Sequence, residues 1–231
     1  MIKSLEIEFI EDKEPKKLHM DFDFSNTNTM YLDKTSDELQ EEPWVQLEYY
    51  KCKQCTLSKD EYRHCPAALS LGKYAKDLFH RHSTDRVAVH VKEDNGRELR
   101  LNSVPLQEVT GELVKLAVFQ SECPTGRRIK KALQFVPVFP NDKEISKAFA
   151  LFFAMQQLRK GADGKSEVEK EQELYLESLH ELFENLCYRV RHITRGDASV
   201  NGVMIYHSLM MLVSLSLPEV LEKVIDEYSN W

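Results

Sequence analysis

The sequence predicts an α+β protein, in which antiparallel β-hairpins and helices are followed by a half made of helices alone. Two observations carry this prediction. Before residue 105, short runs alternate apolar and polar residues with a period of two, as half-buried strands do. After the PVFP segment, residues 137–140, the apolar spacing is helical throughout. We therefore expect an α+β module of residues 1–138 and a helical module of residues 139–231, which can also form one continuous domain.

The alternating runs predict two hairpins. Residues 2–10 and 16–24 alternate on either side of an EDKEP turn. Residues 85–93 and 97–101 alternate on either side of a turn that contains Asn95-Gly96. Asn-Gly between alternating runs is a strong hairpin signal, because both residues accept the positive φ that a tight turn requires.

Between and after the hairpins, the first module is predicted to be mostly helical. Residues 44–50 (WVQLEYY) are the exception and predict a strand, preceded by a polar loop over residues 25–42. Apolar residues recur at helical spacing in three later segments, which are 66–82, 104–120 and 124–135.

Helices fill the second module. The pattern predicts one helix from residue 141 or 142 to 159 and a long one over residues 166–193, separated by a GADGK turn. A third helix ends at Leu217, and Pro218 is predicted to open a short terminal helix, because proline favours the first helical position.

Charge and hydropathy narrow the classes of function. The net charge of −7 gives no global basic field, which argues against a nucleic-acid partner. The N-terminal residues alternate and carry acids, unlike the apolar core of a signal peptide. The longest apolar stretch, residues 203–217, is shorter than the roughly 20 residues of a membrane span, so we expect no membrane. We infer a cytoplasmic protein, in whose reducing compartment clustered cysteines are more often metal ligands or redox groups than disulfides.

Four cysteines carry most of the information about function. Cys52 and Cys55 form a C-x-x-C, and a tight loop of this spacing turns two thiolates toward one metal ion. Cys65 and Cys123 each stand directly before a proline, in HCPAA and ECPTG. Together they predict a four-thiolate metal site. The fifth cysteine, Cys187, lies on the apolar part of a predicted helix and is interpreted as core.

The two Cys-Pro pairs predict that Cys65 and Cys123 each cap the N-terminus of a helix. Proline fits the first helical position, and the positive end of the helix dipole favours a thiolate. We expect His64 to support the site from outside the ligand set, although its imidazole is also a candidate substitute for Cys65. Four thiolates around a divalent ion leave a net negative charge. We expect the basic residues that follow Cys123 to offset it, and these are Arg127, Arg128, Lys130 and Lys131.

Three hypotheses follow for these cysteines. The first is a non-catalytic protein with a structural or regulatory zinc ion, whose helical half packs on the cysteine module or receives a protein partner. The second is an iron–sulfur cluster that senses redox state or stress. The third is a thiol–disulfide oxidoreductase that uses Cys52 and Cys55. No phosphate loop, dinucleotide fingerprint or nucleophile elbow is present, so the sequence favours a protein that is not an enzyme.

The chain also resembles a bacterial family of unknown function. The resemblance rests on KCKQC, HCPAALSL, SECP and DASVN in this order, and it spans about residues 43 to 217. Members of that family pair Cys-Pro motifs in the same order. This chain departs from the family at Lys53 and Thr56, where proline is usual, and at Glu122, where glycine is usual. The resemblance implies that the four cysteines belong together, and it implies no reaction.

Overall fold

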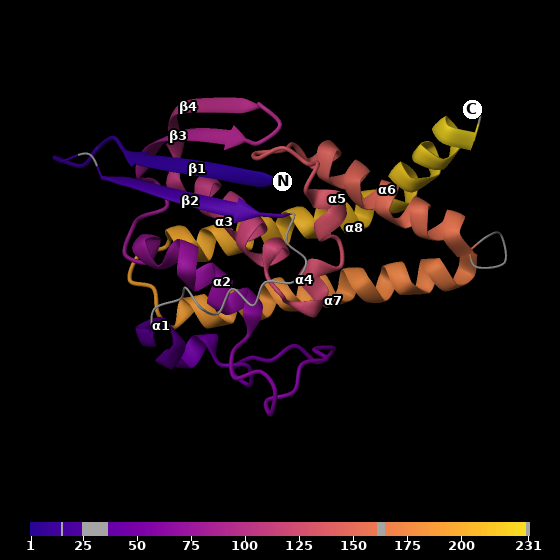
Figure 1. Cartoon of the computed structure of the whole chain (residues 1–231), viewed down its shortest axis with the longest axis horizontal. Helices are drawn as coiled ribbons and strands as arrows, with labels where there is room; N and C mark the ends of the chain where they lie inside the picture. The colour runs from indigo at the N-terminus through magenta and orange to yellow at the C-terminus, as the bar shows by residue number, and fades with distance from the viewer. Residues whose placement is uncertain (15, 25–36, 161–164, 230–231) are drawn as a thin grey trace.

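The computed structural model describes residues 1–14, 16–24, 37–160 and 165–229. It confirms the α+β class: a four-stranded antiparallel sheet in the N-terminal half is followed by a C-terminal half of long helices (Figure 1). The helices lie against one side of the sheet, and α7 and α8 run along most of the length of the molecule (Figure 1).

The sheet consists of the two predicted hairpins placed side by side. Its strands are β1 (Ile2–Phe9), β2 (Lys17–Asp23), β3 (Arg86–Glu93) and β4 (Glu98–Pro105), in the order β2-β1-β3-β4. Alternate side chains of β1 and β3 are buried, as the period of two predicts. Gly96 takes a φ of 87° in the turn between β3 and β4, a conformation that favours glycine.

Helices lie between the two hairpins and between the second hairpin and the C-terminal half. They are α1 (Asp37–Glu41), α2 (Pro66–Ala75), α3 (Leu106–Gln120), α4 (Pro124–Arg127) and α5 (Lys130–Leu133). Of the predicted 25–42 loop, residues 25–36 lie outside the described residues, and α1 occupies most of the rest. The predicted helix over residues 124–135 is wrong as one element, because the chain turns near the buried Ile129 and forms α4 and α5 instead.

The predicted strand over residues 44–50 is also wrong. Pro43–Val45 forms a 3₁₀ turn, and only Gln46 makes an isolated bridge, with His64. Trp44 and Val45 are both buried, at 2% and 0% exposure. A strand points successive side chains to opposite faces, so burying two neighbours in one core requires the chain to turn here.

Three long helices complete the fold, and these are α6 (Asp142–Lys160), α7 (Lys165–Arg191) and α8 (Ala198–Ser229). The predicted break at Pro218 is wrong, because α8 continues through it. Pro218 removes one backbone hydrogen bond, but burial of Leu217, Leu221 and Val224 on one face holds the helix together across it.

Buried residues of both predicted modules form one hydrophobic core. The helix α8 packs on α3, α6 and α7. Gly202 permits a close approach to α3, since a Cβ there would meet Thr110 Oγ1 at 2.5 Å. Over Ala198–Glu227, α8 is also long and apolar enough to cross a membrane, a property it shares with core helices of soluble proteins. The expected absence of a membrane therefore stays a prediction.

Candidate cysteine site

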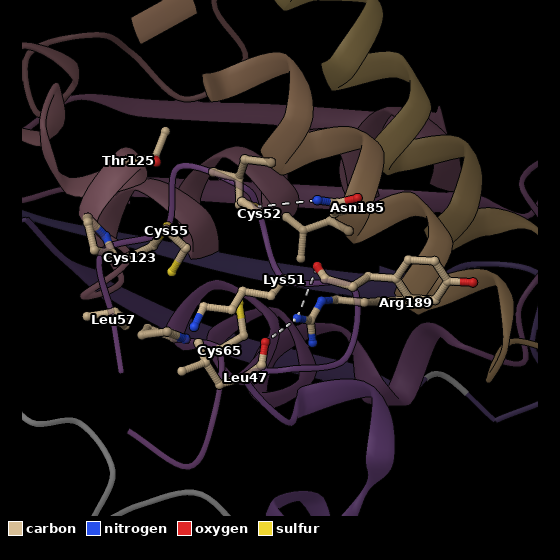
Figure 2. Close-up of a pocket in the computed structure, with 15 residues that line it drawn as sticks. Leu47, Lys51, Cys52, Cys55, Leu57, Cys65, Cys123, Thr125, Asn185 and Arg189 are labelled. Atoms are coloured by element: carbon tan, nitrogen blue, oxygen red, sulfur yellow. Dashed lines mark hydrogen bonds between the residues drawn. The ribbon is translucent and has the colours of Figure 1, made fainter. Parts of the chain in front are cut away.

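One pocket brings together the four cysteines that the sequence analysis selected. Cys52, Cys55, Cys65 and Cys123 all line it, together with residues of α7 (Figure 2). Up to 71 positions separate these cysteines in the sequence, from 52 to 123. Cys187 is absent from the lining of this pocket and is buried in the core, 7% exposed. The cavity in this partly open pocket is about 20 Å³, which is room for a guest the size of one water molecule.

The C-x-x-C loop is a tight turn that docks on α7. The amide of Cys55 donates to the carbonyl of Cys52 at 3.0 Å, which closes the turn. The amide of Lys53 donates to Glu181 Oε1 at 2.9 Å, and Asn185 Nδ2 donates to Cys52 Sγ at 3.6 Å. Ser178 Oγ also donates to Gln54 Oε1. The helix therefore orients the loop through three of its four residues.

Cys65 and Cys123 stand at helix starts, as predicted. Cys65 is the N-cap of α2 and Cys123 the N-cap of α4, each with proline next in the chain. The amide of Cys65 donates to the carbonyl of Val45 at 2.8 Å, which fixes this cap beside the 3₁₀ turn. The side chain of Cys123 is buried, at 7% exposure.

Burial keeps two of the thiols protonated. It raises the pKa of Cys52 to about 11, while the hydrogen bond from Asn185 acts in the opposite direction. Burial and the neighbouring Cys65 raise the pKa of Cys123 far above its usual value, against the lowering effect of the Gly126 amide. Reactive cysteines have lowered pKa values, so these thiols lack the electrostatics of a redox nucleophile.

A buried arginine lies at the same pocket. Arg189 of α7 is 2% exposed, and it lines the pocket beside the cysteines (Figure 2). Its guanidinium donates to the carbonyls of four residues of the preceding segment: Trp44 at 2.5 Å, Gln46 at 2.9 Å, Leu47 at 3.2 Å and Tyr50 at 3.4 Å. Within the described residues, no carboxylate forms an ion pair with it. Arg189 is therefore a buried cation with polar partners and no counter-charge of its own.

The sequence analysis missed the contribution of α7. The polar residues of α7 that contact residues 44–54 follow one another at spacings of three, four and four, which places them on one helix face: Ser178, Glu181, Asn185 and Arg189. This polar stripe beside an apolar one was the signal that could have revealed them. Its partners, residues 44–54, lie more than 120 positions away in the sequence, so the stripe alone did not identify what it contacts.

The basic residues after Cys123 do not face the thiols as expected. Arg127 pairs with Glu122 at 3.3 Å, and Arg128 pairs with Glu171 at 3.5 Å. Lys130 Nζ donates to a backbone carbonyl, that of Gln120, at 3.0 Å. These groups are engaged elsewhere, and none of them lines the cysteine pocket. The cations that line the pocket are Arg189 and Lys51 instead, and Lys51 Nζ pairs with Glu48 Oε1 at 2.9 Å.

His64 also lies outside the pocket, because its Nε2 contacts the carbonyl of Gln40 at 3.0 Å. In the part of the chain that the structure describes, no three His, Cys, Asp or Glu side chains have the arrangement of a formed metal site. The cysteines surround a cavity without converging on one point, since Cys52 Sγ is engaged by Asn185. Coordination of an ion thus requires the thiols to turn toward a common centre, and the metal site stays a prediction.

Comparisons with known proteins give the chain a family and no activity. A family model described as "Domain of unknown function (DUF6901)" matches residues 8–229. Neither the curated proteins nor the solved structures contain a significant match. The chain belongs to the DUF6901 family.

Proposed function

We propose that this member of the DUF6901 family is a cytoplasmic protein that binds one zinc ion through Cys52, Cys55, Cys65 and Cys123. One observation carries the proposal: four cysteines from distant positions line one small pocket next to a buried arginine without a carboxylate. The resemblance in the order of the cysteine motifs supports the same grouping. The ion is structural, and it would join the C-x-x-C loop to the starts of α2 and α4.

Electrostatics favours an anionic group in this pocket. Burying a cation without a counter-charge is costly, even when hydrogen bonds satisfy its donors. Four thiolates around a divalent ion carry a net charge of −2, which would offset the charges of Arg189 and of Lys51, the second cation in the pocket lining. The hydrogen bond from Asn185 to Cys52 would also strengthen on a thiolate, because charge-assisted hydrogen bonds are the stronger ones. Binding would release the protons that the raised pKa values of Cys52 and Cys123 retain.

The size of the cavity favours a single ion over a cluster. About 20 Å³ suits one atom-sized guest, whereas an iron–sulfur cluster needs space for several iron and sulfide atoms. The raised pKa of Cys52 argues against the thiol–disulfide oxidoreductase, which requires a reactive thiolate. The iron–sulfur cluster remains the second candidate because it uses the same four thiolates.

Metal analysis of two matched variants tests the proposal. Cys123→Ser removes a proposed ligand, and Cys187→Ser removes a similarly buried cysteine outside the pocket. We expect one zinc per chain in the wild type and in Cys187→Ser. In Cys123→Ser we expect less than half of that content and a loss of stability. Full metal content in Cys123→Ser, or no metal in the wild type, contradicts the proposal. A brown colour with iron and sulfide after anaerobic purification would identify the cluster instead.

A further inference from the structure

The outer face of α8 is apolar and exposed. From Ala198 to Leu217 the helix contains no Asp, Glu, Lys or Arg. One face packs on α3, α6 and α7, while another is open, where Met204 is 44% exposed, Met211 52% and Leu215 80%. We call this face the α8 stripe, and its members are Met204, Ser208, Met211, Leu212 and Leu215. Contiguous apolar surface of this kind marks an interaction site on a folded protein.

The two ends of the α8 stripe carry opposite charges. At its start, Arg191 of α7 lies against Met204, with 3.6 Å between Nη2 and Sδ. At its end, Glu219 follows Leu215 by one helical turn and is exposed on the same face. Glu219 pairs with Lys223 at 2.5 Å, but both side chains are more than 70% exposed, so the carboxylate can accept a further partner.

We propose that the α8 stripe is the interface of a homodimer, in which the α8 helices of two copies pack antiparallel. A two-fold axis between Ser208 and Met211 places Met204 against the partner's Leu215. The same axis brings Arg191 close to the partner's Glu219. The small Ser208 near the axis permits close approach of the two helices. The proposal is independent of the cysteine pocket, to which the α8 stripe contributes no residue.

The charge pattern selects this occupant over others. A parallel pair of helices would place Arg191 next to the partner's Arg191 and Glu219 next to the partner's Glu219, which is repulsive. A lipid surface favours basic residues around an apolar helix face. Here the C-terminal end of the stripe is flanked by Glu219, Glu222 and Lys223, which together carry −1, and the whole chain carries −7. A second copy, in contrast, supplies both the apolar surface and the opposite charge at each end.

The oligomeric state of the purified full chain tests the proposal. Light scattering after size-exclusion chromatography should give twice the monomer mass of 26.9 kDa. Leu215→Lys should give the monomer mass with an unchanged circular dichroism spectrum. The matched control is Leu158→Lys on α6, which alters a leucine of similar exposure, 82%, and should remain a dimer. A monomeric wild type, or equal behaviour of the two variants, overturns the proposal.

A charge reversal tests the antiparallel arrangement without touching the apolar residues. Arg191→Glu alone should raise the dissociation constant of the dimer by about tenfold, because each end would then face two acids. Adding Glu219→Arg should restore it. A double variant no tighter than the single one contradicts this pairing. The alternative outcome is a monomeric wild type that floats with phosphatidylserine vesicles, together with a Leu215→Lys variant that does not float. That result would identify the α8 stripe as a membrane-binding surface.

Discussion

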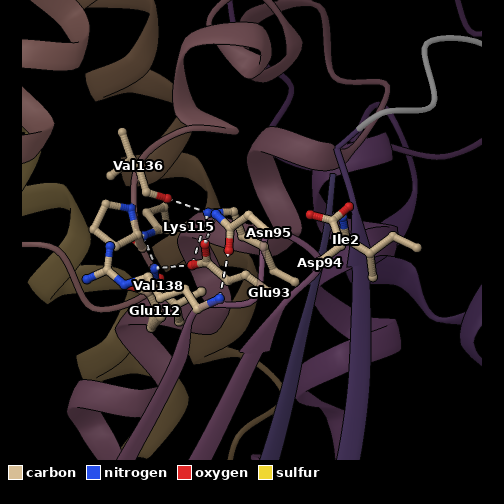
Figure 3. A network of polar contacts seen from close by, with 11 residues as sticks. Ile2, Glu93, Asp94, Asn95, Glu112, Lys115, Val136 and Val138 are labelled. Atoms are coloured by element: carbon tan, nitrogen blue, oxygen red, sulfur yellow. Dashed lines mark hydrogen bonds and ion pairs between the residues drawn. The ribbon is translucent and has the colours of Figure 1, made fainter.

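Two buried charged regions of this molecule balance their charges in different ways. At the cysteine pocket, Arg189 donates to backbone carbonyls, and no carboxylate among the described residues forms an ion pair with it. At the junction of sheet and helices, two lysines and two glutamates lie together in a buried network (Figure 3). Lys3 Nζ lies 3.5 Å from Glu93 Oε1, and Lys115 Nζ lies 2.5 Å from Glu112 Oε1.

The two regions differ in whether the chain itself supplies the opposite charge for the buried cations. The network has equal numbers of positive and negative groups, and backbone groups of residues 136–138 satisfy several of them. Val138 N donates to Glu93 at 3.1 Å, and Lys115 donates to the carbonyl of Pro137 at 3.2 Å. It is therefore complete without a ligand. At the pocket, burial raises the pKa of Cys52 and of Cys123, so under the zinc proposal these two thiols would become thiolates only when the cation binds.

The largest effect is expected from breaking the network. Glu93→Ala leaves Lys3 buried at 1% exposure without its carboxylate, which should lower the free energy of unfolding by about 3–5 kcal/mol. Urea denaturation followed by circular dichroism measures this. The control is Glu41→Ala, which breaks the exposed pair with Arg63 and should cost less than about 1 kcal/mol. Equal costs for the two variants would show that Lys3 does not depend on Glu93.

A smaller effect is expected from removing the charge of Arg189. Arg189→Gln keeps donors for the carbonyls but removes the compensating cation, so zinc affinity should fall by about 10–100-fold, as for other outer-shell partners of metal sites. Competition with a chromophoric chelator measures the affinity. Arg128→Gln, which breaks an ion pair away from the pocket, is the matched control and should bind zinc like the wild type. Unchanged affinity in Arg189→Gln would separate this arginine from the site.

The sequence predicted those elements that neighbouring residues in the chain determine, and it failed for those that contacts with distant segments determine. Both hairpins follow from alternation and from the turn at Asn95-Gly96, and both Cys-Pro caps follow from the next residue in the chain. The strand expected over residues 44–50 failed because the environment of Trp44 and Val45 is set by distant segments. Continuation of α8 through Pro218 likewise depends on tertiary burial that overrides a local signal.

The candidate site shows the same limit. The spacing of Cys52 and Cys55 identifies a thiol pair from sequence alone. Of the two cations in the pocket lining, Lys51 is the chain neighbour of Cys52, but Arg189 does not follow from proximity in sequence. Arg127 and Arg128 are neighbours of Cys123 in the chain but pair with acids elsewhere, whereas Arg189 reaches the pocket because α7 crosses the C-x-x-C loop. Only the packing of α7 reveals this contact.

The smallest effect is a pH dependence that distinguishes the two regions. Burial lowers the pKa of Lys3 from its ordinary value of 10.5, although Glu93 opposes the shift. Between the lowered pKa and 10.5 the unfolded chain binds more protons than the folded one, so this group makes stability rise with pH in that window. Below the lowered pKa both states are protonated, and the contribution is constant.

The difference in unfolding free energy between wild type and Lys3→Met isolates this contribution, because the cysteines titrate alike in both proteins. We expect the difference to grow in favour of the wild type as the pH rises toward 10.5. Parallel profiles for wild type and Lys3→Met would mean that Lys3 keeps its ordinary pKa. In that case the network would fully compensate the buried charge of Lys3. Of the two regions, only the cysteine pocket would then depend on a ligand to compensate its buried cation, Arg189.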